Sequence, residues 1–282
     1  MNERACMTSA GDVDAGMDAG GYPVETTGNA VLDTLEHRSS TRAFARDDDD
    51  RPVAVTDEQR AAILHAASRA PSAGAMMMYS IVSIREQATL DRLADLCDHQ
   101  PMIAKAPWAL IFVVDYAKWI DLFEHVGCFE PEFVERTGKA PRRAPGLGDF
   151  AIAAQDAVVA AEALGLGSCY IGDIVENAEE VAELLDLPPY TMPLSMLIIG
   201  TPRKERPAIA HPVVNLVHEE RYCRADAATM DAQVAEMDAM FRPHARVVGE
   251  RVVDIYTRKH TSPFMAEMSR SMEWWFKNWL GK

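Results

Sequence analysis

The chain has 282 residues, of which 48% are hydrophobic and 25% are charged, values that are ordinary for a globular protein large enough to bury a core. Its 43 acidic and 28 basic residues give a net charge of -15, which disfavours binding to nucleic acid or anionic lipid. No apolar run approaches the roughly 20 residues of a membrane helix, and the first residues lack the apolar core of a secretion signal. The five cysteines show no CxxC spacing, so we expect neither a disulfide framework nor a zinc site, and a reducing cytoplasm is the expected compartment.

The first 28 residues are rich in Gly, Ala, Ser, Asp and Thr and have no hydrophobic period, which predicts a disordered leader at 1–28. We expect one globular domain over 29–282. Its pattern begins where Val31, Leu32 and Leu35 share one face of a predicted helix. The acidic run that follows, at 47–50, predicts an exposed loop.

Helices and strands then alternate along the chain. Thr56 followed by Gln59 is a capping box, and the helix that it begins must end near Pro71. Asn177 with Glu180 predicts a second capped helix. Hydrophobic periods predict strands at 79–84, 108–114, 168–171 and 194–199, and helices at 89–96 and 149–164. Two or three helices are expected after Gly200, so the predicted fold class is α+β with one central sheet.

The segment HRSSTRAF, at 37–44, directly follows the first predicted helix. It places the guanidiniums of Arg38 and Arg42 and the hydroxyls of Ser39 and Ser40 within five residues. Arginine binds phosphate oxygens in pairs and serine adds a neutral donor, so the cluster suits a phosphate group. The alternative is that the arginines only neutralise a helix C-terminus, and the segment alone favours neither interpretation.

Three further segments have residues suited to a ligand. The turn APSAGA, at 70–75, has small side chains that let its backbone approach a flat molecule. Glycines flank the short predicted strand in GLGSCYIG, at 165–172. The basic run RKER, at 203–206, directly follows a strand, where loops often receive phosphate. Taken singly, each segment is also typical of a plain loop, a helix cap or a solvated charge run.

The order and spacing of the four segments resemble the FMN-dependent nitroreductase family, over Leu32 to about Tyr222. The segments HQPMIA, at 99–104, and VHEERY, at 217–222, most resemble its branch of NADPH-dependent nitroreductases and flavin reductases. The resemblance implies a nitroreductase-like α+β fold, with a mainly antiparallel sheet flanked by helices, in an intertwined homodimer. It also implies FMN at the subunit interface, with NAD(P)H and a small electron-poor acceptor as substrates.

The resemblance further assigns residues to the FMN site. Arg38, Ser39 and Ser40 are expected to hold the phosphate and ribityl end. Arg42 is expected near the N1 and O2 edge of the ring, where a fixed cation stabilises charge on reduced flavin. The remaining expected contacts are Pro71, Ser72 and Ala73 along the ring, Gln100 at ribityl or pyrimidine oxygens, Tyr170, Ile171 and Gly172 along the opposite edge, and Lys204 and Arg206 at the phosphate. No side chain is expected to act as a covalent nucleophile or metal ligand.

The chain departs from the family's usual pattern in two places. After the Pro-Ser turn the family commonly has Asn and then Gln-Pro-Trp, whereas residues 75–79 here read AMMMY. Three methionines beside a flavin would form a soft apolar wall. Asp173 stands where relatives often have a second glycine, and its carboxylate would disfavour anionic substrates. The aromatic tail at 272–280 is expected to pack against the partner subunit rather than a membrane surface.

The predicted function is reduction of nitroaromatics, quinones or flavins by ping-pong hydride transfer from NAD(P)H. One alternative on the same fold is reductive dehalogenation or oxidation of a specific metabolite. Another is a flavin-binding sensor or electron relay without catalysis. The sequence leaves open the physiological acceptor and the choice between NADPH and NADH.

Overall fold

The computed structural model describes residues 27–138, 150–204, 217–242, 244 and 246–280. The predicted leader therefore lies almost entirely outside the described residues, as does Arg206. The chain divides into two compact units. The sheet-containing unit consists of Arg38–Arg206 with Ala266–Lys282, and the helical unit consists of Met1–His37 with Pro207–Met265.

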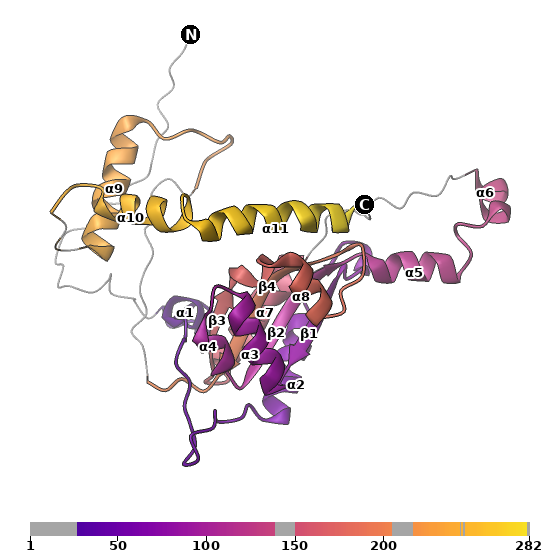
Figure 1. The fold of residues 1–282 in the computed structure, drawn as a ribbon, viewed down its shortest axis with the longest axis horizontal. Coiled ribbons are helices and arrows are strands. Elements are labelled where there is room, and N and C mark those ends of the chain that lie inside the picture. Colours follow the sequence, from indigo (N-terminus) through magenta and orange to yellow (C-terminus); the bar gives the residue numbers. More distant parts are fainter. Residues whose placement is uncertain (1–26, 139–149, 205–216, 243, 245, 281–282) are drawn as a thin grey trace, which may run out of the picture. The chain divides into compact units, whose positions relative to one another are not determined.

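The sheet-containing unit is built around a four-stranded antiparallel sheet in the order β1-β2-β4-β3 (Figure 1). Its strands are β1 (Tyr79–Ile84), β2 (Trp108–Asp115), β3 (Gly167–Ile171) and β4 (Thr191–Gly200). All four strands predicted from the sequence are confirmed, with ends shifted by three residues at most. The central strand β2 is apolar without interruption from Trp108 to Val114 because both faces of the sheet are covered.

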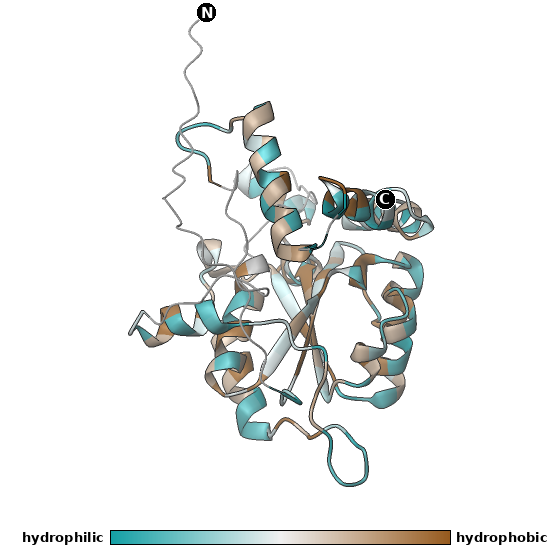
Figure 2. Ribbon diagram, turned by 90° about the vertical axis from the view of Figure 1, so that its left-hand side faces the viewer, coloured by the Kyte–Doolittle hydropathy of each residue, from teal (hydrophilic) through white to brown (hydrophobic). Residues whose placement is uncertain are grey.

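Helices lie on both sides of the strands (Figure 2). On one face, α2 (Asp57–Ser68) and α7 (Phe150–Ala163) share a core with Trp108, Leu110 and Phe112 of β2. Successive side chains of a strand point to opposite faces, so Ala109, Ile111 and Val113 enter the other core. That second core also receives side chains from α3 (Gln87–Leu96), α4 (Pro101–Ala104), α8 (Ala178–Leu184) and α11 (Pro263–Trp279).

Both predicted helix starts exist, but only one has the predicted cap. Thr56 Oγ1 accepts from the Gln59 backbone N–H, and the Gln59 side chain accepts from the Thr56 N–H, as a capping box requires. The predicted side-chain cap by Asn177 does not form, so this prediction is wrong. Asn177 has a left-handed φ of 49°, and its Nδ2 donates instead to Leu96 O at 2.8 Å, which ties α8 to the end of α3.

The sheet-containing unit also has short elements around the strands. They are the 3₁₀ turns η1 (Ala73–Ala75) and η2 (Gly172–Val175), and the helices α5 (Ala117–His125) and α6 (Pro131–Thr137). Turn η1 directly precedes edge strand β1, and η2 directly follows edge strand β3. The segments that the sequence singles out therefore lie at strand ends.

The C-terminal helix α11 packs within its own chain from Ala266 onward. Ser271, Trp275 and Trp279 are spaced four residues apart and occupy one helix face, and all three are buried. Trp275 Nε1 donates to Val175 O at 2.9 Å. The sequence predicts that the aromatic tail packs against the partner subunit, whereas Trp275 and Trp279 lie in the core of the same chain, among apolar side chains of the sheet and the neighbouring helices.

The helical unit contains α1 (Ala30–His37), α9 (Ala227–Phe241), α10 (Glu250–Lys259) and the first residues of α11. Asp238 of α9 accepts hydrogen bonds from the Gly249 and Arg251 backbone N–H groups, which fixes the start of α10. The predicted apolar face of α1 exists, but Val31, Leu32 and Leu35 are exposed. No helix among the described residues of either unit has the length and apolarity to span a membrane.

Candidate functional site

The segment after α1 brings together three of the four sequence motifs. Thr41 N donates to Ser168 O of β3 at 2.8 Å. Arg203 N, just after β4, donates to Ala43 O at 3.0 Å. The HRSSTRAF segment therefore runs beside the start of β3 and the end of β4, and Arg42 precedes the residue that Arg203 contacts.

Two glycines permit this close approach. A Cβ atom on Gly167 would lie 2.1 Å from Thr41 Oγ1, and a Cβ atom on Gly200 would lie 2.7 Å from Phe44 Cδ1. Both distances are too short for a side chain to exist at either position without a shift of the HRSSTRAF segment. The glycines at these strand ends are therefore packing requirements rather than ligand contacts.

We expect Gly167→Ala to lower the free energy of unfolding by about 1–3 kcal/mol, the usual range for overpacking a filled core. The matched control is Gly172→Ala, because a Cβ atom there meets nothing within 4 Å. Urea denaturation of both variants checks this expectation. Equal stability of the two variants would show that the segment does not pack against β3 as described.

Arg38 is half-buried between α7 and β3, beside Glu162 and Tyr170. Burial raises the pKa of Glu162 to about 7, and Arg38 opposes that rise. Burial likewise raises the pKa of Tyr170 to about 12, against the same opposing charge. Glu162 Oε1 and Ser168 Oγ are buried without a hydrogen-bond partner among the described residues. One cation and two unsatisfied polar atoms at this place fit a ligand with polar groups.

The predicted residues of this cluster differ in what they offer. Ser39 and Ser40 are half-buried, whereas Arg42 and Lys204 are exposed. Tyr170 is 39% exposed and Gly172 is exposed, so both face outward. Ile171 is 2% exposed and belongs to the core, so only its backbone is available to a ligand.

Gln100 joins the cluster from the other side of β3. Its Nε2 donates to the Asp173 carboxylate in η2, next to Gly172. No sequence pattern predicts this pair, because the two residues are 73 positions apart. The carboxylate at the unusual position of Asp173 therefore anchors the Gln100 amide, which orients the loop before α4.

The predicted group Pro71, Ser72 and Ala73 lies elsewhere in the chain. It precedes β1, which is separated from β3 by β2 and β4. Three strand spacings correspond to about 14 Å. Pro71 and Ala73 are exposed, and Ser72 Oγ accepts from Met77 N at 2.7 Å. Within one protomer the predicted ligands therefore form two groups at opposite edges of the sheet.

Helix α5 supplies contacts, which sequence reasoning missed, to the segment that leads from this second group into β1. Trp119 Nε1 donates to Met76 O at 2.7 Å, and Lys118 Nζ donates to Tyr79 O at 2.6 Å. Neither residue belongs to a motif, and both act on backbone carbonyls about 40 positions earlier in the chain. No pattern of residue types could have shown these contacts.

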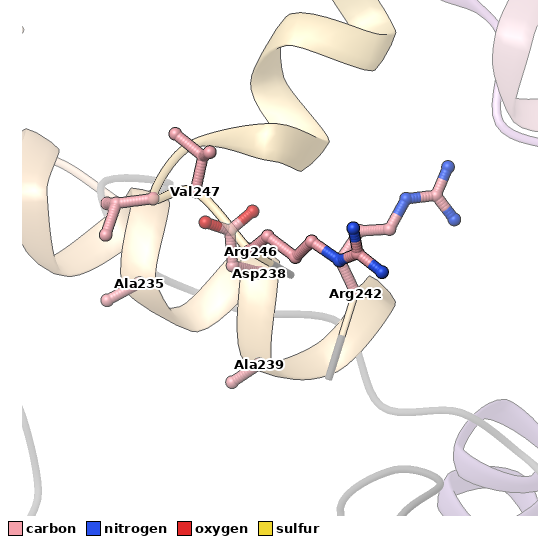
Figure 3. Close-up of a pocket in the computed structure, with 7 residues that line it drawn as sticks. Ala235, Asp238, Ala239, Arg242, Arg246 and Val247 are labelled. Carbon is pink, nitrogen blue, oxygen red and sulfur yellow. The ribbon is translucent and has the colours of Figure 1, made fainter. Parts of the chain in front are cut away.

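A pocket of about 340 Å³ lies in the helical unit, between α9 and the loop before α10 (Figure 3). Arg242, in its wall, forms an ion pair with Asp254. The Asp238 carboxylate already accepts hydrogen bonds from the Gly249 and Arg251 backbone N–H groups. None of the residues predicted for the FMN site lines this pocket, whose lining consists of Ala235, Asp238, Ala239, Arg242, Arg246, Val247 and Val248. In the described part of the chain, no three His, Cys, Asp or Glu side chains are placed to bind a metal ion.

Residues 35–201 match the sequence profile of the Nitroreductase family. The chain belongs to this family. The matched region contains every predicted site residue from Arg38 to Gly172, and Lys204 lies just beyond it. The antiparallel sheet between two helix layers is the nitroreductase fold, as the sequence predicted.

Curated relatives within the nitroreductase family are similar over most of their length. An FMN reductase [NAD(P)H] of Bacillus subtilis is 32% identical over 73% of this chain and 79% of its own. An oxygen-insensitive NADPH nitroreductase of Salmonella typhimurium is 35% identical over 64% and 74%. A solved NADPH:FMN oxidoreductase from Vibrio harveyi, complexed with NAD+, is 25% identical, with a TM-score of 0.65 over 86% of this chain and 97% of its own.

Glu176, between η2 and α8, couples this nitroreductase fold to pH. It is 7% exposed and its Oε2 has no hydrogen-bond partner among the described residues. Burial, together with the nearby carboxylates of Asp98 and Asp173, raises its pKa to about 7. The protonated form is therefore favoured in the folded state.

A raised carboxyl pKa stabilises the fold at acid pH. The contribution of Glu176 is fully present below about pH 4.5, where the unfolded chain titrates, and is lost as pH rises through about 7. We expect the melting temperature to fall between pH 5 and 8, and Glu176→Gln to remove part of that fall. Calorimetry between pH 5 and 8 measures the melting temperatures of the original protein and the variant. Glu183→Gln, at an exposed glutamate, is the control. If Glu176→Gln left the dependence of melting temperature on pH unchanged, the raised pKa of Glu176 would be contradicted.

Proposed function

We propose that this protein is an FMN-dependent oxidoreductase that uses NAD(P)H to reduce nitroaromatics, quinones or flavins by ping-pong hydride transfer. The curated relatives support the reaction class, since they are named as an FMN reductase [NAD(P)H], an oxygen-insensitive NADPH nitroreductase and an NADPH-flavin oxidoreductase. One observation carries the proposal for this chain. In a protein of net charge -15, the HRSSTRAF segment is hydrogen-bonded to Ser168 of β3 and to Arg203, which brings the backbones of two basic segments together.

The residues of the first group fit the phosphate end of FMN. Arg38 supplies a fork of donors, Ser39 and Ser40 supply hydroxyls, and Lys204 adds charge from the loop after β4. The unsatisfied Ser168 Oγ and Glu162 Oε1 leave polar atoms available beside them. Arg42 is exposed and is proposed to stabilise negative charge at the N1 and O2 edge of the ring. When bound, FMN supplies the redox chemistry by taking up a hydride and passing electrons on.

We further propose a homodimer in which two protomers complete each site. The second group, at Pro71–Ala73, lies at the opposite sheet edge from Arg38–Arg42. In a two-fold dimer, the turn of one protomer meets the cationic cluster of its partner, and the two groups then form one site. The proposed substrates are NAD(P)H and a small electron-poor acceptor. Binding to nucleic acid or to a membrane is not part of the proposal. The proposed location is the cytoplasm.

Anaerobic reduction tests the proposed function. NADPH added to the FMN-loaded protein should bleach the flavin absorbance within seconds, and menadione or a nitroaromatic should restore it. A parallel experiment with NADH compares the rates of flavin reduction by NADPH and NADH and so gives the preferred hydride donor. Bleaching without reoxidation by any acceptor would instead support the sensor or electron-relay alternative.

A further inference from the structure

The segment from η1 to the start of β1, called the turn below, has an unusual backbone. Gly74, Ala75 and Met77 have φ values of 59°, 55° and 44°. L side chains rarely adopt this left-handed region, and two of these three residues have one. Such a conformation persists only where the surroundings determine it, and it is frequent at ligand sites.

Hydrogen bonds from α5 and from the Pro-Ser turn hold this conformation. Trp119 Nε1 donates to Met76 O at 2.7 Å, and Met77 N donates to Ser72 Oγ at 2.7 Å. Phe123, one helical turn further along α5, packs against the Trp119 ring at 5.6 Å between centroids. The indole is therefore fixed, and it fixes the backbone on one side of Met77.

The result is that neighbouring methionines point in different directions. Met78 is 7% exposed and fills the core, whereas Met77 is 43% exposed. Met77 lies four residues after the Pro71–Ala73 group, which is expected along the flavin ring. An exposed, polarisable thioether at that place favours contact with aromatic rings.

We propose that Met77 determines acceptor specificity in this enzyme and that Trp119 is its positioning residue, so that uncharged flat aromatic acceptors are preferred. This inference rests on the proposed function. The net charge of -15 points the same way, because it disfavours anionic acceptors.

Two variants test the inference on the FMN-loaded full chain. Met77→Gln replaces the thioether with an amide, and Trp119→Phe keeps a ring but removes the N–H donor. Menadione represents the uncharged aromatic class and ferricyanide the anionic class. We expect both variants to raise the KM for menadione at least fivefold, while kcat with ferricyanide and the Kd for FMN stay within twofold of the original protein.

Equilibrium binding gives a second readout without turnover. Menadione titrated into the oxidised protein in the absence of NADPH should bind at least fivefold more weakly to both variants. Met77→Leu keeps an apolar side chain but removes the sulfur, so its affinity for menadione should lie between those of the original protein and Met77→Gln. Met230→Gln, at an exposed methionine of α9, is the matched control and should change nothing.

The outcomes separate this inference from the function on which it rests. Normal turnover with menadione KM and Kd unchanged in both variants would overturn the specificity role alone. An equal loss of activity with menadione and with ferricyanide would also overturn the specificity role, because the turn would then have only a structural role. An original protein that takes up no FMN would overturn both the inference and the proposed function.

Discussion

Trp275→Ala is expected to lower the free energy of unfolding by about 3–5 kcal/mol, the usual cost of truncating a buried tryptophan. Trp275 is fully buried in the core that α11 shares with α3, α8 and the sheet. The substitution also leaves Val175 O without its donor. Because total stability is typically only about 5–15 kcal/mol, this single change removes a large share of it. Urea denaturation followed by circular dichroism measures the loss.

Phe276 provides the control for this prediction. It is the next residue on the same helix but is 53% exposed. Phe276→Ala should therefore change the free energy of unfolding by less than about 1 kcal/mol. If the two variants were equally stable, α11 would not dock through the face that contains Trp275. If Phe276→Ala instead shifted dimer mass, the exposed face of the tail would belong to the subunit interface.

Arg38→Ala is expected to weaken FMN binding by one to two orders of magnitude. A charge-assisted hydrogen bond contributes about 1.5–3 kcal/mol, which corresponds to roughly 10-fold to 100-fold in Kd. Quenching of FMN fluorescence on titration measures the change. Riboflavin, which lacks the phosphate, should bind the variant and the original protein with similar affinity.

Arg42→Ala separates the two arginines of the segment. Arg42 is exposed while Arg38 is half-buried beside Glu162, so their surroundings already differ. Saturated with FMN, Arg42→Ala should have a lower flavin potential and slower reduction by NADPH, whereas Arg38→Ala should be reduced almost normally. Equal losses of affinity and unchanged reduction rates in both variants would show that the arginines provide only general positive charge.

The strands were predictable because their burial leaves a local pattern. Residues 108–114 are apolar without interruption, and β2 is buried on both faces over the same stretch. The capping box at Thr56 is local in the same sense, since both partners lie within one helical turn. Asn177 shows where local reasoning fails. Its side chain could cap α8, but Leu96 O, 81 positions away, provides the partner that it takes.

The site was predictable in its residue types and less so in its assembly. The order of four motifs indicated the family and therefore the candidate ligands. The sequence contained no signal that Gln100 meets Asp173, or that Trp119 holds Met76, because these contacts depend on how distant elements pack. Burial also changes the role of Ile171, whose side chain belongs to the core while its neighbour Tyr170 faces outward.

The absorption spectrum of the purified protein tests the central claim most directly. The protein is incubated with excess FMN, freed of unbound flavin by gel filtration, and scanned. We predict flavin bands in the blue and near-ultraviolet that elute with the protein, in an amount equal to that of the chain and reduced in Arg38→Ala. A colourless protein that takes up no FMN would contradict the proposed cofactor, the site built around Arg38 and the proposed function together.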